Sequence, residues 1–382
     1  MTWAMTRGVL RAALSAMTTA AMTSAAMTST RPRRSSAFAT VALCRIAAIG
    51  LFMAVTWLAV AVPARAQSSP PHLPRPSDAA VAKLAQSIVR LQAFVPPEAR
   101  SARRLGTKRE GSGVVVDRNG LIVTIGYLIS EAMAVEVTDS TGASHRADVV
   151  AYDHASGLGL VRLSDKAVLP PLEIGNSKTL AERQLVIVAP AGGADAVQPA
   201  LVVSRREFAG SWEYLLDRAI YTSPPSAQFG GAALIGGDGK LLGIGSLILE
   251  AVLPGQPVPG NVFVPIDLLA PILEDIAATG KLRPSNRPWL GMNVEETHGG
   301  MLIVNNVTRD GPARKAGIER GDVVLSVGNQ RIHGLIDFYR RVWSLGGPGV
   351  AVPLEVMQKD GFNRVTIKSD DRNRFYKLQP TY

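Results

Sequence analysis

The sequence predicts a mostly β protein, on the basis of its composition, its turn signals and its alternating strand patterns. Of 382 residues, 47% are hydrophobic, and 36 glycines and 25 prolines supply the turns that short strands need. Asn119-Gly120 and Asp238-Gly239 are typical of tight hairpin turns. Runs such as Val135–Thr138 and Ala147–Tyr152 alternate between apolar and polar residues, as half-buried strands do. A chain of this length has room for two or three domains.

Residues 1–66 have the pattern of a signal peptide. They contain seven arginines and no Asp or Glu, and Ile46–Val62 is an apolar run. Ala64-Arg65-Ala66 is a small-x-small cleavage site. We therefore expect cleavage after Ala66 and a periplasmic or secreted protein. The alternative is an uncleaved inner-membrane anchor, although a run that ends at Pro63 is marginal for spanning a bilayer.

Removing this leader changes the charge balance of the protein. The whole chain carries a formal charge of +10, but the residues after 66 hold 34 basic and 31 acidic side chains, a charge of about +3. Nucleic-acid-binding proteins show a strong basic stripe, so we expect no nucleic-acid partner. The only cysteine, Cys44, lies in the leader, and the five histidines show no metal-ligand spacing. We expect no metal and no cofactor.

The rest of the chain divides by composition. A Pro/Ser-rich flexible linker is predicted at 67–80, followed by a strand-rich domain at 81–280 that closes with a helix over Leu268–Thr279 and the C-cap Gly280. Residues 281–286 form a basic linker, and a second domain occupies 287–375. The basic segment 96–110 is expected to be a solvated loop, with contact to an anionic surface as the alternative.

The stretch from Thr222 to Ala232 lies between two strand-like runs and ends just after a Gly pair. Tight Gly-Gly punctuation ahead of a hairpin turn is where a trypsin-like barrel protease presents its nucleophile. The stretch resembles that of the HtrA/Deg family of trypsin-like serine proteases, in which a serine precedes the Gly pair. Here Phe229 takes that place, and the preceding segment is shorter than the family pattern. We expect the loop that carries the oxyanion-hole amides, around Ala227, to be reshaped.

Two further landmarks resemble the same family and depart from it at the decisive residue. The strand Leu121–Thr124 would be followed by the catalytic histidine, and Tyr127 stands there. The run Asp153–Val161 matches a segment whose second aspartate orients that histidine, and Gly157 stands there. The resemblance implies a double six-stranded β-barrel of the trypsin type over residues 81–280, with a degenerate catalytic triad.

The last domain resembles a bacterial-type PDZ domain, which implies an α+β fold. Trp289-Leu290-Gly291-Met292 matches its carboxylate-binding loop, and Gly311–Val327 matches its core. A peptide C-terminus would add as a strand along Met292–Glu296, as PDZ ligands do. The residues that we expect to bind the peptide are Trp289, Leu290, Gly291, Met292, Tyr339 and Trp343. For Tyr339 and Trp343, burial in the ordinary core is the alternative.

Proteolysis by this mechanism needs a hydroxyl, an imidazole and a carboxylate. Phe229, Tyr127 and Gly157 supply none of these roles, so we expect no turnover through this site and no catalytic residue. His154 with Ser226 is the one substitute pair that the sequence offers, and nothing in the sequence places them in contact. A second hypothesis is that the rings of Tyr127 and Phe229 meet across the former cleft; the alternative is that each packs within its own barrel.

Two functions remain open. The first is a pseudoprotease of the envelope that binds protein C-termini or unfolded proteins through its PDZ domain, as a scaffold, chaperone or regulator. The second is an active HtrA-type serine endopeptidase in periplasmic protein quality control. The resemblance also implies a homotrimer.

Overall fold

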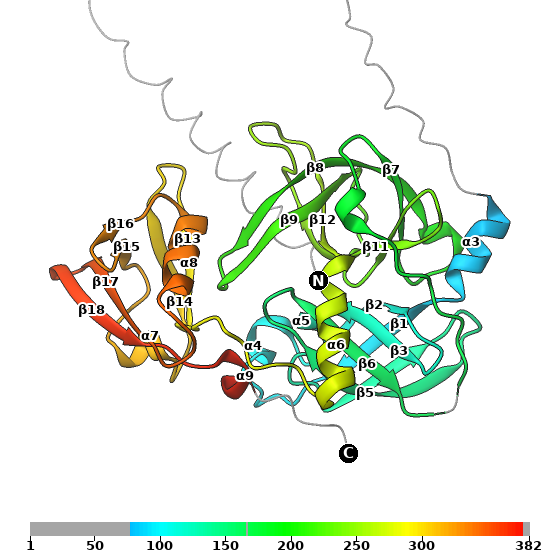
Figure 1. Cartoon of the computed structure of the whole chain (residues 1–382), viewed down its shortest axis with the longest axis horizontal. Helices are drawn as coiled ribbons and strands as arrows, with labels where there is room; N and C mark the ends of the chain where they lie inside the picture. The colour runs from blue at the N-terminus through cyan, green and yellow to red at the C-terminus, as the bar shows by residue number, and fades with distance from the viewer. Residues whose placement is uncertain (1–76, 166, 377–382) are drawn as a thin grey trace, which may run out of the picture. The chain divides into compact units, whose positions relative to one another are not determined.

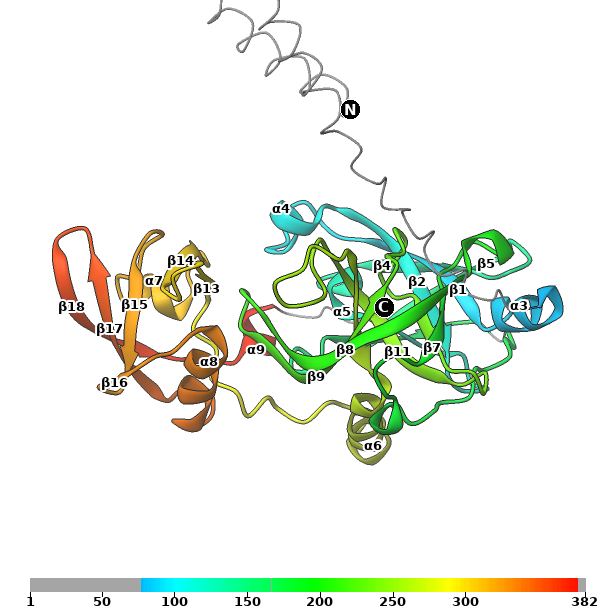
Figure 2. The same cartoon turned by 90° about the horizontal axis from the view of Figure 1, so that it is seen from above.

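The computed structural model describes residues 77–165 and 167–376. The signal peptide, its cleavage site and the linker up to residue 76 lie outside the described residues. All described residues belong to one of the chain's two contact-defined units, residues 71–382. Within it, two six-stranded barrels are followed by a smaller sheet, so the predicted fold class is confirmed (Figures 1 and 2).

The first barrel closes in the order β1-β2-β3-β6-β5-β4, with antiparallel neighbours throughout. Its strands are β1 (Ile88–Phe94), β2 (Lys108–Val115), β3 (Leu121–Ile125), β4 (Ala134–Thr138), β5 (Ser144–Tyr152) and β6 (Leu158–Leu163). Three helices accompany it: α3 (Asp78–Ala85), α4 (Ala102–Leu105) and α5 (Gly126–Ile129). The predicted turn at Gly120, with φ at 71°, joins β2 to β3.

The second barrel closes in the order β10-β11-β12-β9-β8-β7. Its strands are β7 (Leu185–Ala189), β8 (Gln198–Gly210), β9 (Tyr214–Ser223), β10 (Ala233–Ile235), β11 (Leu241–Leu249) and β12 (Gly260–Pro265). Short 3-10 turns lie at η1 (Ser177–Thr179), η2 (Ala194–Ala196) and η3 (Ile266–Leu268), and α6 (Leu269–Thr279) follows. Gly280 ends α6 as a left-handed C-cap with φ at 71°.

The C-terminal sheet has the order β13-β14-β15-β17-β18, with β16 paired to β15. Its strands are β13 (Met292–Glu296), β14 (Leu302–Val307), β15 (Val323–Val327), β16 (Gln330–Arg331), β17 (Ala351–Gln358) and β18 (Gly361–Lys368). The helices are α7 (Pro312–Lys315), α8 (Leu335–Ser344) and α9 (Arg372–Phe375). β13 is an edge strand, so one side of its backbone is open to a further strand.

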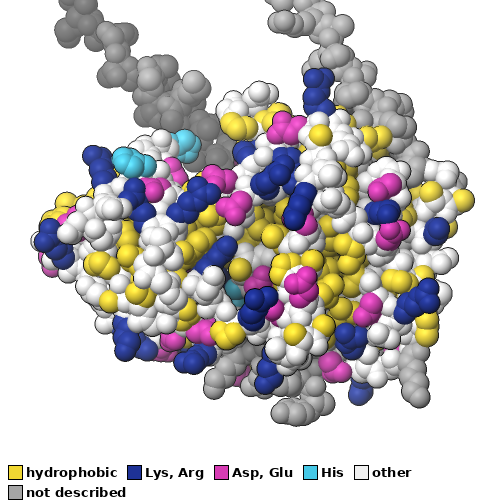
Figure 3. All heavy atoms as spheres, viewed as in Figure 1, with side chains coloured by type: hydrophobic (Ala, Val, Ile, Leu, Met, Phe, Trp, Pro, Cys, Tyr) yellow, Lys and Arg dark blue, Asp and Glu magenta, His cyan; other side chains and the backbone are white. Residues whose placement is uncertain are grey.

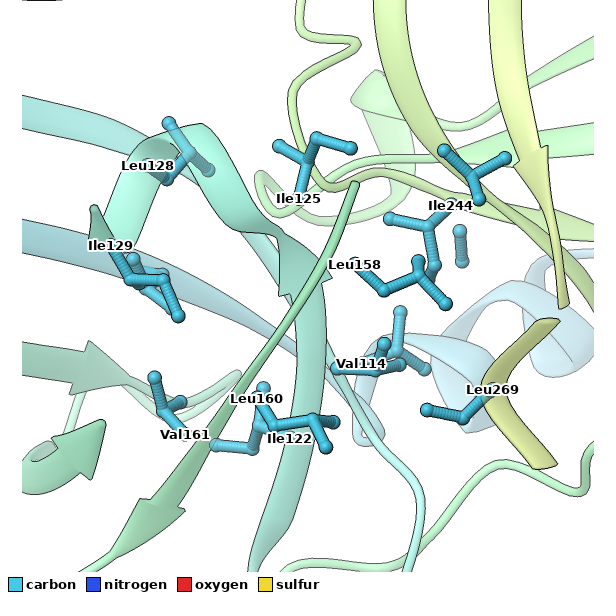
Figure 4. Close-up of a cluster of buried hydrophobic side chains, with 14 of the residues drawn as sticks. Val114, Ile122, Ile125, Leu128, Ile129, Leu158, Leu160, Val161, Ile244 and Leu269 are labelled. Atoms are coloured by element: carbon cyan, nitrogen blue, oxygen red, sulfur yellow. The ribbon is translucent and has the colours of Figure 1, made fainter. Parts of the chain in front are cut away.

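The barrels share one buried core, and the C-terminal sheet has its own. Ile125 and Leu158 of the first barrel cluster with Ile244 of β11 and Leu269 of α6, as Figure 4 shows. A separate cluster around Phe338 holds the C-terminal domain together. Both cores come from alternating strand residues, because successive side chains of a strand point to opposite faces.

The hairpin of β8 and β9 is longer than the sequence predicted (green in Figure 1). The pattern indicated strands at 201–204 and 213–216, whereas β8 has 13 residues and β9 has 10. Glu213 lies in the turn between them, with φ at 57°, and not in a strand. The hairpin tip therefore extends beyond the alternating pattern that marked the strands.

The basic segment 96–110 is not simply a solvated loop. Arg109 begins the buried face of β2 and is only 4% exposed. Its guanidinium donates to the carbonyls of Gly106, Tyr127 and Ser130, at 3.1, 2.8 and 2.9 Å. The prediction of a solvated loop is wrong for this residue, because five fixed donors satisfy several carbonyls at a strand–helix junction.

On the face seen in Figure 3, Lys and Arg side chains intermingle with Asp and Glu side chains. No helix in the described part of the chain combines the length and apolar character that crossing a membrane requires. Across residues 77–165 and 167–376, the side chains that commonly bind metals do not gather in groups of three.

Candidate functional site

The three positions that match the family's catalytic triad lie around one cavity. Tyr127 is on α5 just after β3, Gly157 directly precedes β6, and Phe229 is in the loop between β9 and β10. All three line a cavity of about 440 Å³. Segments far apart in the sequence therefore meet where the sequence placed a degenerate site.

Tyr127 is held by both its backbone and its hydroxyl. Its carbonyl accepts from Arg109, and its hydroxyl donates to the Ser246 carbonyl on β11, at 3.2 Å. Burial raises the pKa of the Tyr127 phenol well above its ordinary value of 10.0. A phenol with a raised pKa, already bonded to a carbonyl, is a poor general base at neutral pH.

Gly157 has no room for a side chain. Its φ is +83°, and a Cβ added there would lie 2.8 Å from the Tyr214 hydroxyl. Tyr214 is anchored by donating to the Ser156 carbonyl at 2.6 Å. The space that an orienting carboxylate would need is occupied by a buried phenol from β9.

The Gly pair after Phe229 is required by close backbone contact. A Cβ at Gly231 would lie 1.9 Å from the Ser112 carbonyl oxygen, and its φ is +75°. The Ser112 amide in turn donates to the Gly230 carbonyl at 2.8 Å. This contact joins the two barrels behind the loop, so the frame of the site persists with a phenylalanine at the nucleophile's position.

The hypothesis that Tyr127 and Phe229 stack across the cleft is wrong. Among the ring pairs of the described residues, none joins these two side chains, and a cavity lies between the groups that line it. Trp212 from the hairpin tip also lines the cavity and stacks on Tyr214, with ring centroids 5.8 Å apart. The aromatic filling of this region comes from β9 and the hairpin turn.

No substitute for the triad is assembled in residues 77–165 and 167–376. Ser226 is bonded through its backbone to the Asn261 side chain, and it does not line the cavity that His154 lines. Burial lowers the pKa of His154 well below 6.5, and its Nδ1 atom is without a hydrogen-bond partner in this part of the chain. His145 bonds only Asp139 and Asp165 through its ring nitrogens.

The predicted carboxylate-binding loop converges on a carboxylate, that of Glu213. The amides of Leu290, Gly291 and Met292 donate to the Glu213 carboxylate oxygens at 2.8, 2.7 and 3.2 Å. Gly291 has φ at +76°, which lets its amide point into the loop. Burial raises the pKa of Glu213 to about 7, against the three amide bonds, which lower it.

The three predicted aromatic contacts lie in different places. Tyr339 of α8 is 1% exposed and donates its hydroxyl to the Gly210 carbonyl at 2.7 Å. Trp343 stacks on Tyr339 with centroids 5.4 Å apart. Trp289 packs instead against Phe375 of α9, with centroids 4.6 Å apart. Tyr339 and Trp343 thus lie beside the hairpin contact, and Trp289 supports the loop from α9.

Comparison with known proteins decides the family. A model of the trypsin-like peptidase domain matches residues 111–244, and a model of the PDZ domain matches residues 288–368. A probable periplasmic serine endoprotease, DegP-like, from Pseudomonas fulva is 26% identical over 293 residues, which are 72% of this chain and 59% of that protein. The chain belongs to the HtrA family.

Other relatives of this HtrA protein have the same domain order or a related name. The serine protease Do-like HtrA of Lactobacillus helveticus is 28% identical over 63% of this chain and 64% of its own length. The serine endoprotease DegS of Salmonella typhimurium is 25% identical over 65% of this chain and 73% of its own length. The chain spans less than two thirds of the Pseudomonas and Lactobacillus relatives.

Solved structures of the family were also found. The serine endoprotease from Yersinia pestis has a TM-score of 0.46 at 24% identity, covering 78% of this chain and 99% of its own. The HtrA-type protease AlgW with decapeptide has a TM-score of 0.46 at 19% identity, with the same coverage.

Sequence reasoning missed the residues that other elements bring to these sites. Glu213 was assigned to a strand, and Tyr214 was not recognised as the group that fills the space at Gly157. Their roles depend on which element faces them across the fold. One available signal was the exposed turn composition Gly210-Ser211-Trp212-Glu213, which interrupts the alternating pattern.

Proposed function

We propose that this HtrA family member is a non-catalytic protein of the periplasm that binds peptides or unfolded proteins through its PDZ domain, as a scaffold, chaperone or regulator. The observation that carries the proposal is the convergence of the Leu290, Gly291 and Met292 amides on a carboxylate. These are the donors that would receive a peptide C-terminus while the peptide pairs with the β13 edge.

The residues at the catalytic positions support the same proposal. Loss of the nucleophile or the base in a related mechanism costs about 10⁶ in turnover, which is about 8 kcal/mol of barrier. Phe229 and Tyr127 replace both groups, and Tyr214 closes the third position at Gly157. The periplasmic location comes from the names of the relatives and from the leader expected at 1–66.

The second candidate is an active serine endopeptidase in protein quality control, which the names of the relatives favour. Hydrolysis of unfolded casein by the purified chain separates the two, with trypsin as the positive control. We expect no turnover above background. Turnover that disappears in Ser226→Ala would favour the endopeptidase and contradict the proposal.

Peptide binding tests the proposal directly. The probe is a fluorescent peptide ending in leucine with a free C-terminal carboxylate, compared with its C-terminal amide. Gly291→Ala should weaken binding about tenfold or more, since a hydrogen bond to a charged group contributes about 1.5–3 kcal/mol. Gly300→Ala is the matched control, because Gly300 has a similar φ of +74° but no atoms within 4 Å of an added Cβ.

Equal binding of the free and amidated peptides by all variants would contradict carboxylate recognition. The homotrimer that the family resemblance implies stays a prediction, and sedimentation of the purified chain would check it.

A further inference from the structure

The PDZ loop of this chain holds a carboxylate from the same chain. Glu213 is at the tip of the β8–β9 hairpin, and its side chain is 8% exposed. Its Oε1 atom accepts from Gly291 and Met292, and its Oε2 atom accepts from Leu290. A carboxylate that accepts several amide donors reproduces the contacts of a peptide C-terminus.

The hairpin tip also occupies the open edge of β13. The Val294 amide donates to the Ser211 carbonyl at 2.9 Å. β13 pairs with β14 on its other side, so this bond lies on the edge where a peptide strand would add. The backbone of Ser211 therefore stands where the backbone of a ligand would stand.

An apolar residue completes the contact. Leu215 is 4% exposed and belongs to the hydrophobic core of the PDZ domain, whereas its neighbour Leu216 belongs to the barrel core. Adjacent strand residues point to opposite faces, so β9 contributes to both cores at once. Leu215 takes the part of the apolar side chain that anchors a PDZ ligand.

Polar contacts with α8 fix the position of the tip. The Tyr339 hydroxyl donates to the Gly210 carbonyl at 2.7 Å and accepts from the Glu213 amide at 3.1 Å. Arg340 pairs with Glu207 of β8 and Asp217 of β9. Both flanks of the groove, β13 and α8, are thus engaged by one hairpin.

The backbone at Glu213 is unusual for its residue type. Its φ of 57° lies in the left-handed region, where a three-residue hairpin turn favours glycine or asparagine. A side chain other than glycine there costs about 1–2 kcal/mol. The turn accepts this cost together with a buried carboxylate, which indicates that the carboxylate contributes to the contact with the PDZ loop.

We propose that the hairpin tip, residues 210–215, is an internal ligand that closes the PDZ groove, so that an outside peptide binds only after the hairpin leaves. The inference rests on the proposed function, because it describes the regulation of that same site. The carboxylate, the paired backbone and the apolar anchor of the tip occupy all three subsites that a peptide would use. A tethered ligand competes at high effective concentration, which lowers the apparent affinity for free peptides.

Removal of the carboxylate tests the proposal in the purified full chain. Glu213→Gly relieves the turn and deletes the internal ligand, and Glu213→Gln keeps its shape with one acceptor oxygen. The probe is the fluorescent free-carboxylate peptide used above. Glu213→Gly should bind it about tenfold or more tightly than the parent, if the closed form makes up about nine tenths of the molecules. Glu213→Gln should lie between the two.

Glu131→Gly is the matched control. Glu131 has a φ of 56°, and its carboxylate accepts from the amides of Arg100 and Ser101 in the first barrel, away from the groove. We expect it to leave peptide affinity unchanged. Tightening by Glu131→Gly as large as that by Glu213→Gly would overturn the inference, because it would show a general loosening of the fold.

Hydrogen exchange provides a readout that needs no peptide. In the parent chain, the amides of residues 290–292 and 294 should be protected, and Glu213→Gly should release them. Release without any peptide binding would support the internal ligand and contradict the proposed function. Peptide binding with equal affinity in parent and variant, and unchanged exchange, would overturn the internal ligand and leave the proposed function supported.

Discussion

Gly157 shows how a single position controls the chemistry of the former site. The residue has a positive φ, and the Tyr214 hydroxyl fills the space beside its Cα. Two independent constraints, backbone strain and packing, therefore oppose any side chain at this position. Restoring an aspartate by mutation would require β9 to move as well.

Gly157→Ala should lower the free energy of unfolding by more than the about 1–2 kcal/mol that left-handed strain alone costs. Gly142→Ala is the control, because Gly142 has a φ of +89° and no atoms within 4 Å of an added Cβ. Urea unfolding of both variants measures the difference. Equal losses would show that contact with Tyr214 adds nothing.

His145 lies between two aspartates on β5, a different kind of polar site. Its ring nitrogens contact Asp165 at 2.8 Å and Asp139 at 3.1 Å. Hydrogen bonds to Asp165 and then Asp139 raise the pKa of His145 above 6.5. The folded protein therefore binds this proton more tightly than the unfolded chain does.

The stability that His145 contributes should be present in full below pH 6.5 and disappear as the pH rises through its raised pKa. His145→Gln should flatten the fall in unfolding free energy over this range. Denaturant titrations at several pH values measure it, with the exposed His298→Gln as control. An unchanged slope in His145→Gln would contradict the assignment.

At the scale of elements, β9 is the strand that connects recognition with the barrel. Leu215 faces the PDZ core and Leu216 faces the barrel core. The same strand carries Tyr214, which fills the space beside Gly157. Movement of the hairpin would therefore be felt at the cavity of the former catalytic site as well as at the groove.

Leu215→Ala and Leu216→Ala form a matched pair for this element. Each should destabilise the fold by about 2–4 kcal/mol, the usual cost of truncating a buried leucine. Only Leu215→Ala should also tighten binding of the free-carboxylate peptide, because only it weakens the closure of the groove. Similar affinities in the two variants would argue against a role of β9 in closure.

For the whole molecule, the closed groove should depend on pH. The pKa of Glu213 rises from 4.5 to about 7 mainly through burial, while Arg372 of α9 and the three loop amides lower it and the Tyr339 hydroxyl lies beside it. The closed form then holds a proton that the open form releases. Closure should be strongest below pH 4.5 and weaken as the pH rises through about 7.

Peptide affinity should therefore rise between about pH 5 and about pH 8 in the parent chain, since the open fraction sets the apparent affinity. Glu213→Gln should lose this part of the dependence, and any contribution of the peptide's own carboxylate remains in both proteins. Fluorescence anisotropy across the range measures it. Parallel pH profiles would contradict the titration of Glu213.

The sequence by itself determined the β-rich class, the order of the two domains, the two hairpin turns and the loop that begins at Trp289. These features are local, since turn residues, alternating strands and Gly-rich loops act through neighbours in the chain. It also determined that Tyr127, Gly157 and Phe229 stand at the three matched positions, and the structure brings them to one cavity.

Only the tertiary structure decided what surrounds those positions. Tyr214 closes the space at Gly157, Arg109 fixes the backbone of Tyr127, and Glu213 enters the PDZ loop, each from an element distant in sequence. Such contacts depend on strand length and on which face of a strand meets which neighbour, and the alternating pattern specifies neither. A turn glutamate in the sequence is an ordinary exposed residue until a second domain supplies three amides to its carboxylate.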